Sequence, residues 1–261
     1  MIRLAANLSM LFQDLPFLER FGAAAKAGFK GVEYIAPYEE SAAGIRAELD
    51  RHGLKQVLFN AATGDWAAGE RGLGGNPDRT HDCRKGIDLA IEYARALDCQ
   101  NIHLMAGYKP ATHDLDACLA AMASNLTYAA DAAAPHGITI LVEAINSKID
   151  MPGYVIDGTA KALDVIERAA RKNIAFQYDV YHMQIMEGDL ARVIERLLPR
   201  IGHIQIADNP GRNEPGSGEI NYAWLLPRIE ALGYSGWIGC EYRPAAGTLD
   251  GLGWARPWLK A

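Results

Sequence analysis

Short apolar runs alternate along the chain with longer stretches in which apolar residues recur every three or four positions. The first pattern is typical of buried strands and the second of amphipathic helices. The pattern predicts eight strands, at Ile2–Asn7, Gly31–Ile35, Leu54–Asn60, Asn101–Met105, Ile138–Glu143, Ile174–Asp179, Ile201–Ala207 and Trp237–Glu241.

The helical spacing is clearest after the first strand, where Phe17, Leu18 and Phe21 share one face. This segment begins at Pro16 and ends before Gly28, which are residue types that favour the start and the end of a helix. Similar stretches are predicted at 87–97, 115–126, 163–170 and 225–232. Strand and helix therefore alternate through the whole chain.

Eight strand–helix units in 261 residues predict an α/β fold, a single (β/α)₈ TIM barrel formed by residues 1–261. A doubly wound open sheet is less favoured, because no Gly-x-Gly-x-x-Gly follows the first strand and no change in composition divides the chain. The long Gly-rich connection at 61–77 carries Trp66 and Glu70, and we expect it to form a lid.

The charge balance narrows the partners that the chain can bind. The formal net charge is −6, which argues against general nucleic-acid binding but allows a small anionic substrate. The N-terminus does not resemble a signal peptide, and no apolar run is long enough to cross a bilayer. The four cysteines are widely spaced and predict buried, reduced thiols in a cytoplasmic protein: Cys83, Cys99, Cys118 and Cys240.

The last four predicted strands each bring an oxygen-bearing side chain to the carboxyl end of the barrel, where barrel enzymes have their active sites. These residues are Glu143, Asp179, Gln205 and Glu241. Converging carboxylates repel one another unless a cation neutralises them, and oxygen ligands favour Mg²⁺ or Mn²⁺ over zinc. The alternative is that each residue is an independent rim charge in a salt bridge.

Two further residues are candidates for binding a substrate. His182 follows Asp179 by three residues and could donate a hydrogen bond, and Arg212 could clamp a carboxylate through its guanidinium group. His103 and His203 are more typical of packed residues that support a site. The chain contains no Gly-x-Ser-x-Gly elbow and no P-loop, so acyl transfer and nucleotide hydrolysis have no support.

Several segments resemble the hydroxypyruvate isomerase family of the xylose-isomerase-like barrels: AANLSMLF, GDWAAGERG, LVEAIN, QYDVYHMQ, HIQIADNPGRNEPGSGEINY and GWIGCEY. The resemblance implies a divalent metal held by Glu143, Asp179, Gln205 and Glu241, with Glu143 and Glu241 as proton donor and acceptor. A sister group acts on 2-oxo-tetronates and shares AANLSM and GWIGCEY. Related ketose epimerases carry His where this chain has Gln205.

The predicted reaction interconverts hydroxypyruvate and tartronate semialdehyde through an enediolate. His182, Arg212, Glu70 and Trp66 would then bind the substrate, a small anionic hydroxy-keto acid, with no nucleic acid or membrane as partner. Four alternatives stay open: a 2-oxo-tetronate isomerase, a sugar epimerase, a sugar-acid or inosose dehydratase, and an abasic-site endonuclease on the same barrel. The sequence also leaves open whether the protein is a homo-oligomer.

Overall fold

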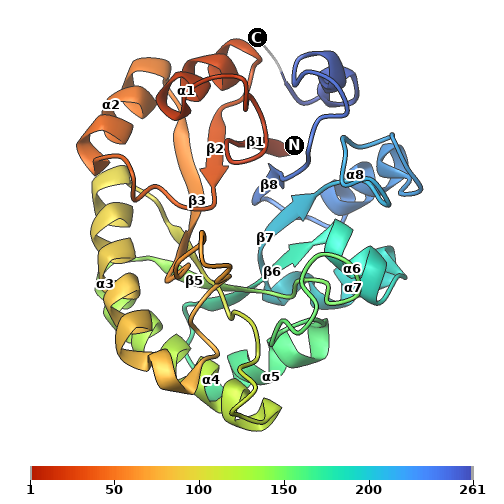
Figure 1. The fold of residues 1–261 in the computed structure, drawn as a ribbon. Helices are drawn as coiled ribbons and strands as arrows, with labels where there is room; N and C mark the ends of the chain where they lie inside the picture. Colours follow the sequence, from red (N-terminus) through yellow and green to blue (C-terminus); the bar gives the residue numbers. More distant parts are fainter. Residues whose placement is uncertain (1, 260–261) are drawn as a thin grey trace.

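The computed structural model describes residues 2–259 and shows a closed barrel of parallel strands surrounded by helices (Figure 1). Each strand pairs with the next along the chain, and the last pairs with the first. The strands are β1 (Arg3–Asn7), β2 (Gly31–Tyr34), β3 (Lys55–Ala61), β4 (Asn101–Leu104), β5 (Thr139–Glu143), β6 (Ile174–Asp179), β7 (Ile201–Ile206) and β8 (Trp237–Cys240). The predicted (β/α)₈ barrel is confirmed.

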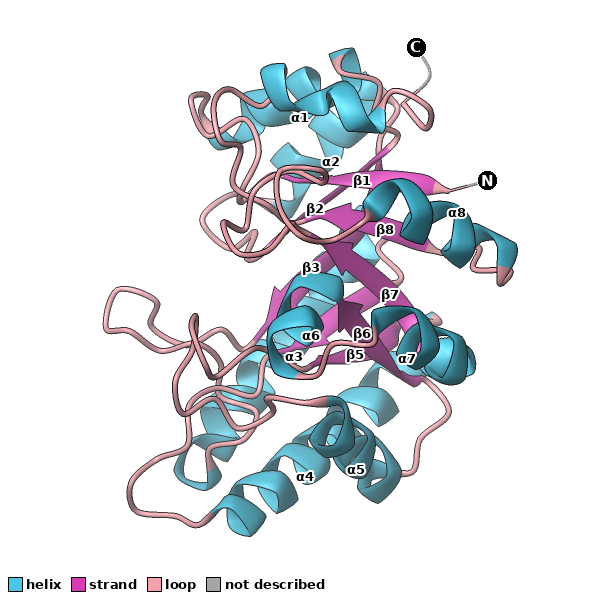
Figure 2. Ribbon diagram, turned by 90° about the vertical axis from the view of Figure 1, so that its right-hand side faces the viewer, coloured by secondary structure: helices cyan, strands magenta, loops and turns pink. Residues whose placement is uncertain are grey.

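The helices lie on the outside of the strands in both views (Figures 1 and 2). They are α1 (Phe17–Lys26), α2 (Ala42–His52), α3 (Thr80–Leu97), α4 (Leu115–Ala133), α5 (Thr159–Ala169), α6 (Val180–Met186), α7 (Leu190–Leu197) and α8 (Tyr222–Ala231). Short 3₁₀ turns are η1 (Pro77–Arg79), η2 (Ala134–His136), η3 (Leu198–Arg200) and η4 (Asp250–Ala255).

Every predicted strand is present, and each observed boundary lies within one residue of the predicted one. The predicted helix at 163–170 runs one residue too far, because Ala170 adopts the left-handed conformation and ends α5. A left-handed residue after the last turn is a common way for a helix to stop.

The inside of the barrel changes from apolar to polar along the strands. Side chains two residues apart in a strand point to the same face. A small apolar cluster includes Leu141 and Ala175. The same face continues with Glu143 in β5 and with Gln177 and Asp179 in β6. The polar groups therefore gather toward the carboxyl end of the barrel.

Gly239 in β8 makes room for one of these interior polar groups. A Cβ atom at this position would overlap the carboxylate of Glu33, which is fully buried on β2. A larger residue at this position would therefore displace the Glu33 carboxylate from its place beside the β8 backbone.

The connection that follows β3 contacts the barrel near its C-terminal end. Gly72 forms a bridge with Ala106, and a Cβ atom on Gly72 would overlap Met105. The four cysteines are buried and unpaired, as the sequence predicts. Within the described residues, no helix is long and apolar enough to span a bilayer.

Candidate active site

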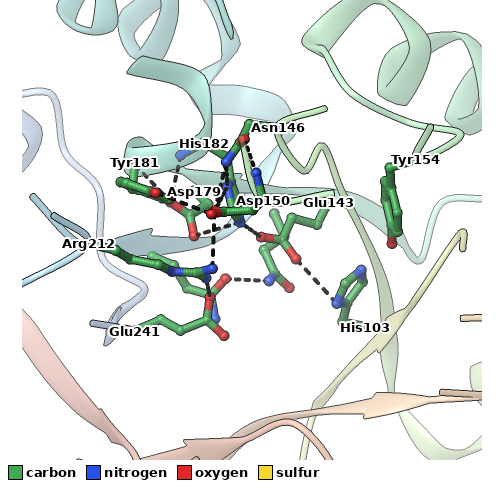
Figure 3. Close-up of polar contacts among 12 residues, drawn as sticks. His103, Glu143, Asn146, Asp150, Tyr154, Asp179, Tyr181, His182, Arg212 and Glu241 are labelled. Atoms are coloured by element: carbon green, nitrogen blue, oxygen red, sulfur yellow. Dashed lines mark hydrogen bonds and ion pairs between the residues drawn. The ribbon is translucent and has the colours of Figure 1, made fainter. Parts of the chain in front are cut away.

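Three carboxylates meet at the carboxyl end of the barrel, as Figure 3 shows. Glu143 ends β5, Asp179 ends β6 and Glu241 follows β8 directly. With His182 they form a group in which one potential ligand atom from each residue lies within 4.8 Å of all the others. All four side chains are buried, so the predicted convergence of the three carboxylates is confirmed.

Burial and mutual repulsion make these carboxylates hard to ionise. Burial, followed by the charges of Glu241 and Asp179, raises the pKa of Glu143 well above its ordinary value. Burial raises the pKa of Asp179 to about 6 and that of Glu241 to about 8, although the nearby Arg212 lowers both. These buried, neighbouring carboxylates therefore bind protons more tightly than separate, exposed carboxylates do.

Two oxygens of this group fit a bound cation. Among the described residues, neither Oε1 of Glu143 nor Oδ2 of Asp179 has a hydrogen-bond partner, although both atoms are buried. A buried anionic oxygen without a partner is costly unless a proton or a metal ion compensates it. The donor set, dominated by carboxylate oxygens, suits a hard divalent ion.

Arg212 is the cationic side chain in contact with this group. Its Nη2 atom donates to Oε2 of Glu241 at 2.9 Å, and its Nη1 atom donates to Oδ2 of Asp150 at 3.3 Å. The guanidinium group lies over the ring of Tyr181, 5.1 Å from its centroid. Arg212 thus lies in the predicted site, and its role as a carboxylate clamp stays a prediction.

His182 also lies in the predicted site. Its Nε2 atom is 3.8 Å from Oε1 of Glu143 and 3.7 Å from Oδ2 of Asp179. On the opposite edge of the ring, Nδ1 is 2.7 Å from Nδ2 of Asn146. Burial, followed by the charge of Arg212, lowers the pKa of His182 well below its ordinary value, so the imidazole is neutral at physiological pH.

Gln205 points into a second polar layer. Its Nε2 atom donates to Oε1 of Glu33 at 2.8 Å, and its Oε1 atom accepts from Gln177 at 2.5 Å. The strand pairing sets Gln205 level with Asp179 on β6. The amide oxygen keeps a second lone pair, so metal coordination by Gln205 stays a prediction.

Glu33 is a buried residue of the site that was not predicted from the sequence. It accepts from His203 at 2.7 Å and from Asn7 at 3.0 Å, and Asn7 reaches Glu241 at 3.2 Å. The supporting place predicted for His203 is therefore observed. The signal was available, since Glu33 is the only charged residue in the predicted strand Gly31–Ile35.

His103 lies beside the carboxylates, with Nδ1 3.5 Å from Oε2 of Glu143. Burial, with a smaller contribution from His203, lowers the pKa of His103 to about 3, so its ring is neutral. It is a packed, uncharged neighbour of Glu143, as the sequence suggested.

Trp66 and Glu70, the residues of the predicted lid, contact residues close to them in the chain. Glu70 pairs with Arg79 at 2.5 Å and accepts from the backbone N–H of Asp65 at 2.6 Å. Trp66 is 40% exposed, and the guanidinium group of Arg71 lies 4.0 Å from its ring centroid. Substrate binding by Trp66 and Glu70 stays a prediction.

Asp208, also missed from the sequence, organises the loop that carries Arg212. Its Oδ1 atom accepts from the backbone N–H groups of Asn209 at 2.9 Å and Ile220 at 3.0 Å. Its Oδ2 atom accepts from Gly216 at 2.8 Å and Gly218 at 3.0 Å. One buried carboxylate therefore ties both ends of the segment 209–220 together.

A barrel with carboxylates gathered at its carboxyl end is an arrangement found in barrel enzymes, and comparisons with known proteins identify the family. A family model described as a xylose isomerase-like TIM barrel matches residues 21–258, and the chain belongs to this family.

The chain is similar over almost its whole length to proteins of known name. It is 51% identical to the 2-oxo-tetronate isomerase of Cupriavidus necator, covering 99% of each chain. It is 45% identical to the hydroxypyruvate isomerase of Escherichia coli, over 99% of this chain and 100% of that one. A crystal structure described as an AP endonuclease, family 2, from Brucella melitensis superimposes with a TM-score of 0.97 at 48% identity, covering all of both chains. The named isomerases support an isomerase activity for this chain.

Proposed function

We propose that this protein is a metal-dependent isomerase of short 2-oxo-3-hydroxy acids. The observation that carries the proposal is the buried group of three carboxylates, two of whose oxygens have no partner within residues 2–259. The relationship to full-length isomerases agrees with it.

The metal would be held by Glu143, Asp179 and Glu241, with the amide oxygen of Gln205 as the fourth protein ligand. A bound divalent ion supplies a positive charge that stabilises the oxygens of an enediolate. Mg²⁺ and Mn²⁺ are the ions that the oxygen ligands favour.

Glu143 and Glu241 are the proposed acid and base. The substrate loses the proton on C3 to one carboxylate, and C2 receives a proton from the other. The proton of the C3 hydroxyl group passes to the C2 oxygen, so the carbonyl group moves from C2 to C3 and no atom is gained or lost. Burial raises the pKa of Glu241 to about 8, which supports the proposal that this carboxyl group carries a proton near neutral pH.

Arg212 and His182 would hold the substrate. Arg212 already contacts two carboxylates, Asp150 and Glu241, and the proposal adds the carboxylate of the substrate to its partners. His182 would donate a hydrogen bond to a substrate oxygen. Trp66 and Glu70 would belong to a lid that closes over the bound acid and excludes water.

Two substrates share this chemistry. Hydroxypyruvate, the substrate predicted from the sequence, would give tartronate semialdehyde. The second candidate, 2-oxo-tetronate, carries one more carbon on C3 and is favoured by the relative at 51% identity. We further propose that the enzyme acts in the cytoplasm on a free small molecule, independently of nucleic acid and membranes. Sedimentation analysis would measure whether it forms a homo-oligomer.

The deciding experiment compares kcat/KM for hydroxypyruvate and 2-oxo-tetronate with one purified preparation. The assay is repeated after exhaustive chelation and after addition of Mg²⁺ or Mn²⁺. We expect activity to disappear on chelation and to return with the metal. Full activity in the chelated protein would refute metal dependence, and no turnover of either acid would refute the proposed reaction.

A further inference from the structure

His182 has two chemical roles open to it, and its ring protonation decides between them. Its Nε2 atom belongs to the group that could hold a metal ion, beside Glu143 and Asp179. An unprotonated Nε2 is a metal ligand, whereas a protonated Nε2 is a hydrogen-bond donor and cannot coordinate. The hydrogen bonds on the other edge of the ring settle which form is present.

Asn146, fully buried after β5, has a fixed amide orientation. Its Oδ1 atom accepts from the backbone N–H groups of Ile149 at 3.0 Å and Asp150 at 2.9 Å. Turning the amide over would set its NH₂ group against these two donors. It would also set its oxygen against the carboxylate of Asp150, 2.9 Å from Nδ2. The orientation is therefore determined by groups whose donor or acceptor character is not in doubt.

The NH₂ group of Asn146 has two hydrogens and two neighbours, Oδ2 of Asp150 and Nδ1 of His182. The contact to Nδ1 is 2.7 Å, and an amide nitrogen can only donate in it. Nδ1 must therefore be unprotonated. An imidazole ring with no proton on Nδ1 carries its proton on Nε2, which lies beside Glu143 and Asp179 (Figure 3).

We propose that Asn146 is a positioning residue that fixes His182 as the Nε2–H tautomer, so that His182 donates a hydrogen bond to the substrate and does not coordinate the metal. This inference rests on the proposed function for the identity of the substrate. The assignment of the tautomer itself is a property of the protein alone. It leaves the fourth protein ligand position to Gln205.

The direct test is a long-range ¹H–¹⁵N spectrum of the metal-free protein labelled at histidine. The signals of His182 are assigned by their absence in His182→Gln. We expect Nε2 of the wild type to give the signal of a protonated ring nitrogen and Nδ1 that of an unprotonated one. The reverse pattern would overturn the proposal, whatever substrate the enzyme uses.

Asn146→Asp replaces the donor by an oxygen of nearly the same shape. We expect the two ¹⁵N signals of His182 to exchange their character or both to become protonated, and kcat to fall about 10- to 1000-fold, the cost of one lost donor to a developing charge. Asn125→Asp is the matched control, because Asn125 is equally buried and lies on α4. It should leave the His182 signals unchanged. Wild-type signals in Asn146→Asp would contradict the proposed role of Asn146.

Metal affinity provides a readout that does not depend on turnover. The amide nitrogen of Gln can replace Nε2–H as a donor, so His182→Gln should bind Mn²⁺ within about twofold of the wild type, whereas loss of a true ligand should weaken binding about tenfold or more. Calorimetric titration with Mn²⁺ measures this directly. A tenfold weaker affinity in the folded variant would assign His182 to the metal and refute the proposal. Absent isomerase activity with normal tautomer and metal data would instead refute only the proposed function.

Discussion

Replacing Asp208 by alanine removes the acceptor of four backbone hydrogen bonds in the loop that carries Arg212. Water can reach the exposed residues Gly216 and Gly218 and replace two of the bonds. The bonds to Asn209 and Ile220 are the ones lost without replacement. At about 1.5–3 kcal/mol for each of these two bonds to a charged group, the free energy of unfolding should fall by about 3–6 kcal/mol.

Thermal unfolding measures this loss. At about 2–4 °C per kcal/mol for a chain of this size, the melting temperature should fall by about 6–24 °C. Asp208→Asn keeps one oxygen and should lose roughly half as much, because its NH₂ group faces two N–H donors. Asp116→Ala is the control, since that side chain is 80% exposed and pairs with Arg168 on the surface. It should change stability by less than about 0.5 kcal/mol.

The same variant should impair activity, because Arg212 is held in a left-handed conformation (φ 54°) within this loop. A displacement of about 1 Å in a binding group can cost on the order of 100-fold, so kcat/KM of Asp208→Ala should fall at least about tenfold below the melting temperature. A melting temperature within about 2 °C of the wild type would refute the stability estimate. Unchanged kcat/KM would refute the coupling of Asp208 to Arg212.

Three further outcomes are expected. Glu143→Gln and Glu241→Gln should each lower kcat by at least about 100-fold with an unchanged circular dichroism spectrum, because an amide cannot exchange the proton; wild-type turnover in either would exclude its role. The pKa of Glu241 is raised from 4.5 to about 8, so the folded protein holds this proton more tightly than the unfolded chain does. This contribution to the free energy of unfolding is fully present below pH 4.5 and is lost as the pH rises through about 8. The melting temperature of the metal-free wild type should therefore fall more steeply across this range than that of Glu241→Gln, and parallel curves would contradict the assignment. Arg212→Lys should raise KM about tenfold, since one ammonium group replaces a bidentate fork, and an unchanged KM would exclude a clamp.

The barrel could be predicted from the sequence because short, mostly apolar runs alternate regularly with amphipathic helical stretches. In LVEAIN and QYDVYH, the first acidic residue marks the end of the strand and the start of the site. The boundary at Ala170 was missed because a left-handed conformation at an alanine leaves no mark in the pattern of apolar positions.

Site residues could be predicted where they lie at the end of an apolar strand. Residues whose role depends on contacts between distant segments were missed. Glu143, Asp179 and Glu241 each end or follow an apolar run, so their convergence follows from the barrel. Asn146 looks like an ordinary loop residue until its contact with Nδ1 of His182 is seen. Asp208 looks equally ordinary, because its partners are backbone groups that carry no sequence signal.

The missing side chain at Gly239 has a consequence for redesign. A design that transfers only the three carboxylates into another barrel would leave out the layer of buried polar residues beneath them, here called the floor of the site. In this protein the floor includes Glu33, which occupies the space that a Cβ atom on Gly239 would need. A host strand with alanine or valine at that point would expel the Glu33 carboxylate and release Gln205, which it holds. The smallest transferable unit therefore includes a residue with no side chain at all.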